Sequence, residues 1–150
     1  MTTEHVVDAP EVLALMEKAV AERGEDWVYP AQGDCRYQYD PYDYDDETWA
    51  GPEEKAMVAY FGDVKAPACL VGKVLFDLNP EFLEQIVRNG DNGESVEALH
   101  LESGWVIGDE TFLFTADAIH ALQVGQSAQD TGVPWGESVD RAKKRIAGIA

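Results

Sequence analysis

Residues 115–146, TADAIHALQVGQSAQDTGVPWGESVDRAKKRI, carry the strongest structural signal in this 150-residue chain, because they predict two helices joined by a tight turn. Thr115 is a suitable N-cap for the first helix, which we expect to run to about Asp130 and to stop at Gly132. The second helix has apolar residues at steps of four, three and four, which predicts a buried stripe: Trp135, Val139, Ala142 and Ile146.

An amphipathic helix is also predicted near the N-terminus. Asp8 is a suitable N-cap, Pro10 stands in the first turn, Glu11 occupies the third position, and Gly24 ends the helix. We expect residues 1–7, which precede it, to be loose.

The region before residue 115 predicts further helix. Pro67 begins a segment with apolar residues on one face, Asn79-Pro80 ends that helix and begins another, and Gly90 ends the second. Residues 95–101 are long enough for one or two more turns. The apolar runs 105–107 and 112–114 flank Gly108-Asp109-Glu110, which predicts a hairpin or a tight loop.

Residues 25–64 differ from the rest of the chain. Aromatic and alternating segments predict strands at 27–29, 35–39 and 57–61, although 53–61 also contains good helix formers. We therefore expect one α+β domain over residues 1–150. It should have a small antiparallel sheet in its N-terminal half, packed by four to six helices that lie mostly in the C-terminal part.

Composition excludes several classes of protein. With 45% hydrophobic and 27% charged residues, the chain can form a hydrophobic core and is not typical of a disordered protein. It has no apolar run of about 18 residues and no basic, apolar leader at its start, so we expect a cytoplasmic protein. The 29 acidic residues against 11 basic ones give a net charge of −18, which argues against direct binding to nucleic acid or to an anionic membrane.

The acidic residues are concentrated in the segment 34–54, which holds eight acids and one base, Arg36. We expect residues 40–54 to form an acidic loop. Tyrosine and tryptophan side chains alternate with the acids, and such a strip suits a basic protein surface, because the carboxylates pair with Lys and Arg while the rings add contact area and cation–π partners. The predicted partner-binding residues are Tyr39, Asp40, Tyr42, Asp43, Tyr44, Asp45, Asp46, Glu47 and Trp49.

Two other interpretations of this segment stay open. Acidic surfaces keep proteins soluble without serving any partner, and the aromatic residues can pack on the sheet. Asp40, Asp43, Asp45 and Glu47 also supply oxygen ligands of the kind calcium prefers, but their spacing is not that of an EF-hand loop. We expect no cofactor.

Cysteine and histidine residues offer weak candidate sites. Cys69 follows Pro67 and should lie in the first turn of a helix, where free N–H groups lower a thiol's pKa, so it is the one catalytic candidate. Burial as a small hydrophobic residue is the commoner role of a free cysteine. Cys35, Cys69, His100 and His120 are candidate zinc ligands despite their irregular spacing, and a disulfide between the two cysteines is a further alternative.

Common catalytic signatures are missing from the sequence. It contains neither a phosphate-binding glycine loop nor the G-x-S-x-G, H-E-x-x-H or G-x-G-x-x-G patterns. We therefore expect a protein that is not an enzyme.

Two segments together carry a family resemblance. The first is P-A-C-L-V-G at residues 67–72, and the second is A-Q-D-T-G-V-P-W-G at residues 128–136. In this order they resemble small proteins of unknown function from actinobacteria and their bacteriophages, in which a histidine often stands where this chain has Lys73. The resemblance covers about residues 27–145 and implies a bacterial or phage origin, and so a location in the cytoplasm of a bacterial host cell, but it implies no activity.

These observations lead to one expected function and two alternatives. We expect a small acidic binding protein, encoded by a phage, that docks on a basic host or phage protein and modulates it, for example by imitating the charge of nucleic acid. The alternatives are a thiol- or metal-dependent enzyme built around Cys69 and a structural or assembly protein whose acidic surface only keeps it soluble.

Overall fold

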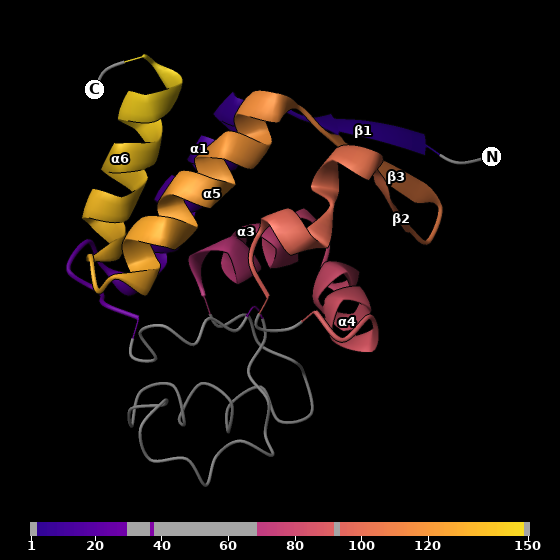
Figure 1. Ribbon diagram of the computed structural model, residues 1–150, viewed down its shortest axis with the longest axis horizontal. Coiled ribbons are helices and arrows are strands. Elements are labelled where there is room, and N and C mark those ends of the chain that lie inside the picture. Colours follow the sequence, from indigo (N-terminus) through magenta and orange to yellow (C-terminus); the bar gives the residue numbers. More distant parts are fainter. Residues whose placement is uncertain (1–2, 30–36, 38–68, 92–93, 149–150) are drawn as a thin grey trace, which may run out of the picture.

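The computed structural model describes residues 3–29, 37, 69–91 and 94–148 (Figure 1). A three-stranded sheet lies at one end of the long axis and the C-terminal helix at the other, with the remaining helices between them. The expected α+β class is confirmed. None of the described helices is long and apolar enough to cross a membrane.

The sheet joins the N-terminal strand to a hairpin that lies more than 100 residues later in the chain. Strand β1 (Thr3–Val7) pairs in parallel with β3 (Glu110–Phe114), and β2 (Trp105–Ile107) pairs antiparallel with β3, so the order is β1-β3-β2. The sheet is therefore mixed, not antiparallel as expected. The expectation that residues 1–7 are loose is wrong for β1. Two further backbone hydrogen bonds hold this strand at its ends: Thr3 N–H donates to the Asp109 carbonyl, and Thr115 N–H donates to the Val7 carbonyl.

Local capping residues set the helix boundaries near the N-terminus and in the middle of the chain. Helix α1 (Ala9–Arg23) begins where the Asp8 carboxylate accepts the Glu11 N–H at 3.0 Å, and it ends at Gly24, as predicted. Helix α3 (Leu70–Leu78) ends at Asn79. The side chain of Asn79 then accepts the first N–H of α4 (Glu81–Arg88).

The C-terminal part follows the predicted pattern closely. Two short 3-10 helices (Glu97–Leu99 and Leu101–Ser103) lead into the β2–β3 hairpin, and the Thr115 side chain caps α5 (Ala116–Asp130). Helix α6 (Trp135–Ile146) returns along α5 and also packs on α1. Its predicted stripe is confirmed, because Trp135, Val139 and Ala142 are buried and Ile146 packs against the core.

The expected strands between residues 25 and 64 are not present where the structure describes that region. Residues 27–29 form no strand; instead Tyr29 is buried and the Trp27 ring packs edge-on against Trp135, with 6.1 Å between the ring centroids. The expected strands at 35–39 and 57–61 lie outside the described residues, apart from Tyr37, which is buried.

Candidate functional site

An acidic groove of about 450 Å³ lies between α1 and α6. Besides the acidic residues that give the groove its charge, its walls include the apolar residues Val20, Pro134 and Val139. The one basic residue in its lining, Lys143, forms an ion pair with a groove carboxylate. The five carboxylates that line this groove are Glu17, Glu25, Asp26, Glu137 and Asp140.

The loop after α1 brings two of these acids to the start of α6. Trp135 N–H donates to the Trp27 carbonyl at 2.8 Å, and Gly136 N–H donates to the Glu25 carbonyl at 2.9 Å. A side chain at position 136 would place its Cβ 2.8 Å from both the Cβ and the carbonyl oxygen of Glu25, so only glycine permits this approach. The loop therefore holds Glu25 and Asp26 beside the first turn of α6.

The helix dipole explains part of this acidity. Carboxylates are stabilised near the N-terminus of a helix, which suits Glu25, Asp26 and Glu137. Glu17 projects from α1, and Asp140 lies beyond the first turn of α6, so the dipole does not account for these two. All five carboxylate residues are exposed, and repulsion among them is tolerated in water but would be relieved by a bound cationic group.

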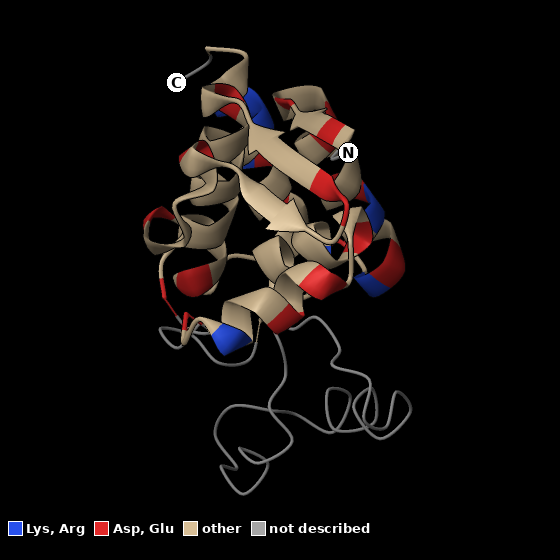
Figure 2. Cartoon of the chain, turned by 90° about the vertical axis from the view of Figure 1, so that its right-hand side faces the viewer, with Lys and Arg blue, Asp and Glu red and all other residues tan. Residues whose placement is uncertain are grey.

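The groove belongs to an acidic surface. The described residues include 20 of the 29 acids and 8 of the 11 bases, and red acidic segments occur on helices, turns and strand ends in Figure 2. Half of the described bases stand between Arg141 and Arg145 in the last turns of α6. Of these four bases, Lys143 lines the groove.

Apart from the buried Tyr37, the acidic segment 34–54 lies outside the described residues. This applies to every residue predicted to bind a partner. By sequence, the segment begins eight residues after Asp26, which itself lines the groove. The residues concerned are Tyr39, Asp40, Tyr42, Asp43, Tyr44, Asp45, Asp46, Glu47 and Trp49.

Cys69 is fully buried and has a capping role. It is the N-cap of α3, not a residue of the first turn, and its Sγ accepts the Gly72 N–H at 3.3 Å. It carries a free thiol, so it does not form the alternative disulfide with Cys35, which lies outside the described residues. Burial leaves the Sγ atom no access to a substrate in this conformation.

The two histidines proposed as zinc ligands lie on separate elements. His100 is exposed in the left-handed conformation between the two 3-10 helices, with its Nδ1 3.3 Å from the Glu102 carboxylate. His120 lies on α5. Among the described residues, no three His, Cys, Asp or Glu side chains are grouped closely enough to hold a metal ion.

The structure brings together the two segments that carry the family resemblance. Gln129 is fully buried, and its Oε1 accepts both the Leu70 N–H at 2.7 Å and the Trp135 Nε1–H at 3.1 Å. Its Nε2 donates to the Asp130 carboxylate at 3.0 Å. One amide side chain thus links the start of α3, the end of α5 and the start of α6, so this motif has a structural explanation.

Lys73, the position where the resembling proteins often carry histidine, is part of an ion-pair cluster. Its Nζ lies 2.7 Å from the Glu22 carboxylate and 3.0 Å from that of Asp77, and Lys18 approaches Asp77 at 3.6 Å. The cluster joins α1 to α3 and leaves Lys73 only 13% exposed. This arrangement stabilises packing and does not form a reactive site.

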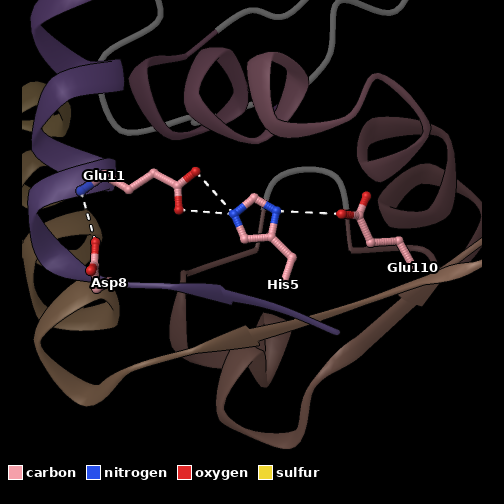
Figure 3. A network of polar contacts seen from close by, with 4 residues as sticks. All are labelled: His5, Asp8, Glu11 and Glu110. Atoms are coloured by element: carbon pink, nitrogen blue, oxygen red, sulfur yellow. Dashed lines mark hydrogen bonds and ion pairs between the residues drawn. The ribbon is translucent and has the colours of Figure 1, made fainter. Parts of the chain in front are cut away.

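His5 is the centre of a polar network that the sequence analysis missed (Figure 3). Its Nε2 contacts both Glu11 carboxylate oxygens at 2.9 and 3.0 Å, and its Nδ1 lies 3.5 Å from the Glu110 carboxylate. The hydrogen bond with Glu11 raises the pKa of His5, against a smaller opposing effect of burial. Because β1 pairs with a strand more than 100 residues away, local sequence contained no signal for this network.

Comparisons of the chain with protein-family models, with curated proteins and with solved structures gave no match. The geometry described above is therefore the basis for assigning a function.

Proposed function

We propose that this protein is a non-catalytic, acidic binding protein that docks on a basic protein surface. The observation that carries the proposal is the groove between α1 and α6, in which five exposed carboxylates face a single lysine. A Lys or Arg side chain of a partner entering this groove would meet several carboxylates and the apolar surface of Val20 and Val139. It would gain both charge pairing and contact area.

In this proposal the acidic segment 34–54 also takes part in binding the partner. Its tyrosines and Trp49 supply rigid aromatic contacts, and its carboxylates add to the field that attracts a basic partner. An excess of charges of one sign raises the rate of encounter with an oppositely charged partner, and added salt reduces this rate.

A partner that binds nucleic acid fits this chemistry best. Such a protein presents Lys and Arg in the spacing of a phosphate backbone, and an acidic surface can occupy that site in place of the nucleic acid. The protein would then act as an inhibitor of a host or phage protein.

Affinity purification from bacterial lysate tests the proposal. The tagged full-length chain is the bait, the washes are at low and moderate salt, and mass spectrometry identifies what is retained. We expect one basic protein, retained at low salt and reduced at moderate salt. An empty eluate, or retention that salt does not change, would contradict the proposal.

Three variant baits of equal charge separate a defined surface from general acidity. The groove variant is Asp26→Asn, Glu137→Gln and Asp140→Asn, and the segment variant is Asp43→Asn, Asp45→Asn and Asp46→Asn. The matched control neutralises three exposed acids outside both regions, Glu84→Gln, Glu94→Gln and Glu102→Gln. We expect the first two to lose the partner and the control to keep it. Equal loss in all three would show that net charge alone is responsible.

A further inference from the structure

A second hollow, of about 510 Å³, lies on the other flank of α6, where that helix faces α5. Unlike the acidic groove, it carries cationic and hydrogen-bonding side chains: His120, Gln123, Ser127 and Thr131 from the α5 side, and Arg141 and Arg145 from α6. Val124 and Ala128 give it a small apolar floor. The two flanks of one helix therefore differ in charge.

The antiparallel packing of α5 and α6 explains how these residues meet. His120 lies near the start of α5 and Arg145 near the end of α6, so the return of the chain places them at the same end of the helix pair. Arg141 and Arg145 are one helical turn apart and project from the same side of α6. Lys144 lies between them in sequence but does not line the hollow.

Most of these polar groups are uncommitted. Within the part of the chain that the structure describes, the side chains of His120, Gln123, Ser127 and Arg145 make no hydrogen bond or ion pair. Arg141 has only a 3.7 Å contact with Glu137, and both side chains are about half exposed, so this pair contributes little stability. Glu97, on the rim, forms no ion pair with either arginine.

A smaller hollow of about 310 Å³ continues from the first one. The two share Glu97, Gln123, Ser127 and Thr131, and the smaller one is completed by Ser95, Val96, Gln126 and Asp130. Its acceptors include the half-buried Asp130 carboxylate, which suits hydroxyl donors. An elongated ligand would thus meet cations at one end and acceptors at the other.

We propose that this pair of hollows between α5 and α6 is a binding site for a small phosphomonoester with a hydroxyl-rich body, such as a sugar phosphate. The combined hollows are within the size range of small-molecule sites. Two guanidinium groups and an imidazole provide several donors for the phosphate oxygens. The serine, glutamine and aspartate side chains pair with hydroxyl groups. This site is separate from the acidic groove and does not depend on the proposed function.

The long-range field of the protein opposes an anion, but its effect is limited. At physiological ionic strength, exposed charges are screened over about 8 Å, so the charges that act on a ligand are chiefly those of the lining, where Arg141 and Arg145 stand against Glu97. The helix dipole favours cations at the end of α6, which by itself would explain Lys144 as well as the arginines. The position of both arginines in the hollow is what distinguishes a site from a stabilised helix end.

Titration of the full-length protein with ribose 5-phosphate, followed by NMR of the backbone amides, tests this proposal. Inorganic phosphate and ribose are the comparison ligands. We expect saturable binding of ribose 5-phosphate with a dissociation constant below about 1 mM, shifts confined to α5, α6 and residues 95–97, weaker binding of phosphate, and none of ribose.

Matched variants locate the binding. Arg141→Gln and Arg145→Gln should each weaken binding by about tenfold, whereas Lys144→Gln, with the same loss of charge on the same turn, should leave it unchanged. Gln123→Ala should weaken binding of ribose 5-phosphate but not of phosphate. Absence of saturable binding up to about 10 mM, equal affinity for phosphate and ribose 5-phosphate, or equal losses in Arg145→Gln and Lys144→Gln would overturn the proposal.

Discussion

Replacing Gln129 with leucine tests the link between the two sequence motifs. Leucine has a similar volume but no acceptor, so two buried donors, the Leu70 N–H and the Trp135 Nε1–H, lose their partner. Both lie in the core at the junction of three helices, where water does not replace the lost oxygen. We expect the Gln129→Leu variant to fold but to be much less stable.

The magnitude follows from these two hydrogen bonds. Leaving a buried donor unsatisfied costs about 1–3 kcal/mol, and the leucine side chain regains part of this through apolar contact, so we expect a loss of about 3 kcal/mol in the free energy of unfolding. For a domain of this size that corresponds to a melting temperature lower by about 6–12 °C. Gln123→Leu, on the same helix but without a hydrogen bond in the described structure, should change stability by less than about 0.5 kcal/mol.

Urea unfolding followed by circular dichroism gives the measurement. A shift of the midpoint without a change of slope identifies a loss of stability. Trp135→Phe removes one of the two donors, so the double variant should lose about 1 kcal/mol less than the sum of the single variants. Equal effects of Gln129→Leu and Gln123→Leu, or full additivity with Trp135→Phe, would refute the proposed network.

Three further predictions concern close packing and titration. Gly72→Ala places a Cβ 2.1 Å from the Tyr37 carbonyl oxygen, so it should cost more than about 2 kcal/mol in urea unfolding. Gly125→Ala places its Cβ near the ends of two side chains, 2.8 Å from Met16 Cε and 3.3 Å from Leu70 Cδ2, and not near a backbone atom, so it should cost less. The pKa of His5 is raised in the folded state, so its ion pairs contribute their full stability below the unfolded-state pKa of about 6.5 and lose it as pH rises through the folded-state pKa. His5→Gln should therefore lower the free energy of unfolding by up to about 1 kcal/mol near pH 5.5 and by almost nothing near pH 8.5. Equal losses at the two pH values would contradict this. Burial likewise raises the pKa of Asp130, so this carboxyl group favours folding only at acidic pH, where it is protonated. Asp130→Asn should therefore leave the protein equally or slightly more stable at pH 7. A clear loss of stability at that pH would contradict this.

Helix boundaries could be predicted from sequence because their causes are local. The caps at Asp8 and Thr115 and the end at Gly24 each depend on a few neighbouring residues. The buried stripe of α6 likewise follows from helical periodicity alone. These elements were predicted correctly.

The sheet could not be derived in the same way. Strand β1 is only five residues long and finds its partner β3 more than 100 residues later, so its pairing depends on tertiary packing. Residues 27–29 show the opposite error, because their aromatic side chains suggested a strand that does not form. The Trp27 ring instead packs on Trp135, and the Trp27 carbonyl accepts a hydrogen bond from the Trp135 N–H at the start of α6. The acidic groove was missed for the same reason, since its carboxylates come from α1, the following loop and α6.

The central claim is tested most directly by the association rate of the full-length protein with the basic partner recovered from lysate, measured by stopped flow at two ionic strengths. For the wild type we expect fast association that falls steeply with salt. The groove variant Asp26→Asn, Glu137→Gln, Asp140→Asn should associate about tenfold more slowly at low salt and depend less on salt, while the control variant Glu84→Gln, Glu94→Gln, Glu102→Gln should remain close to the wild type. Equal rates for the two variants would contradict a defined acidic binding surface.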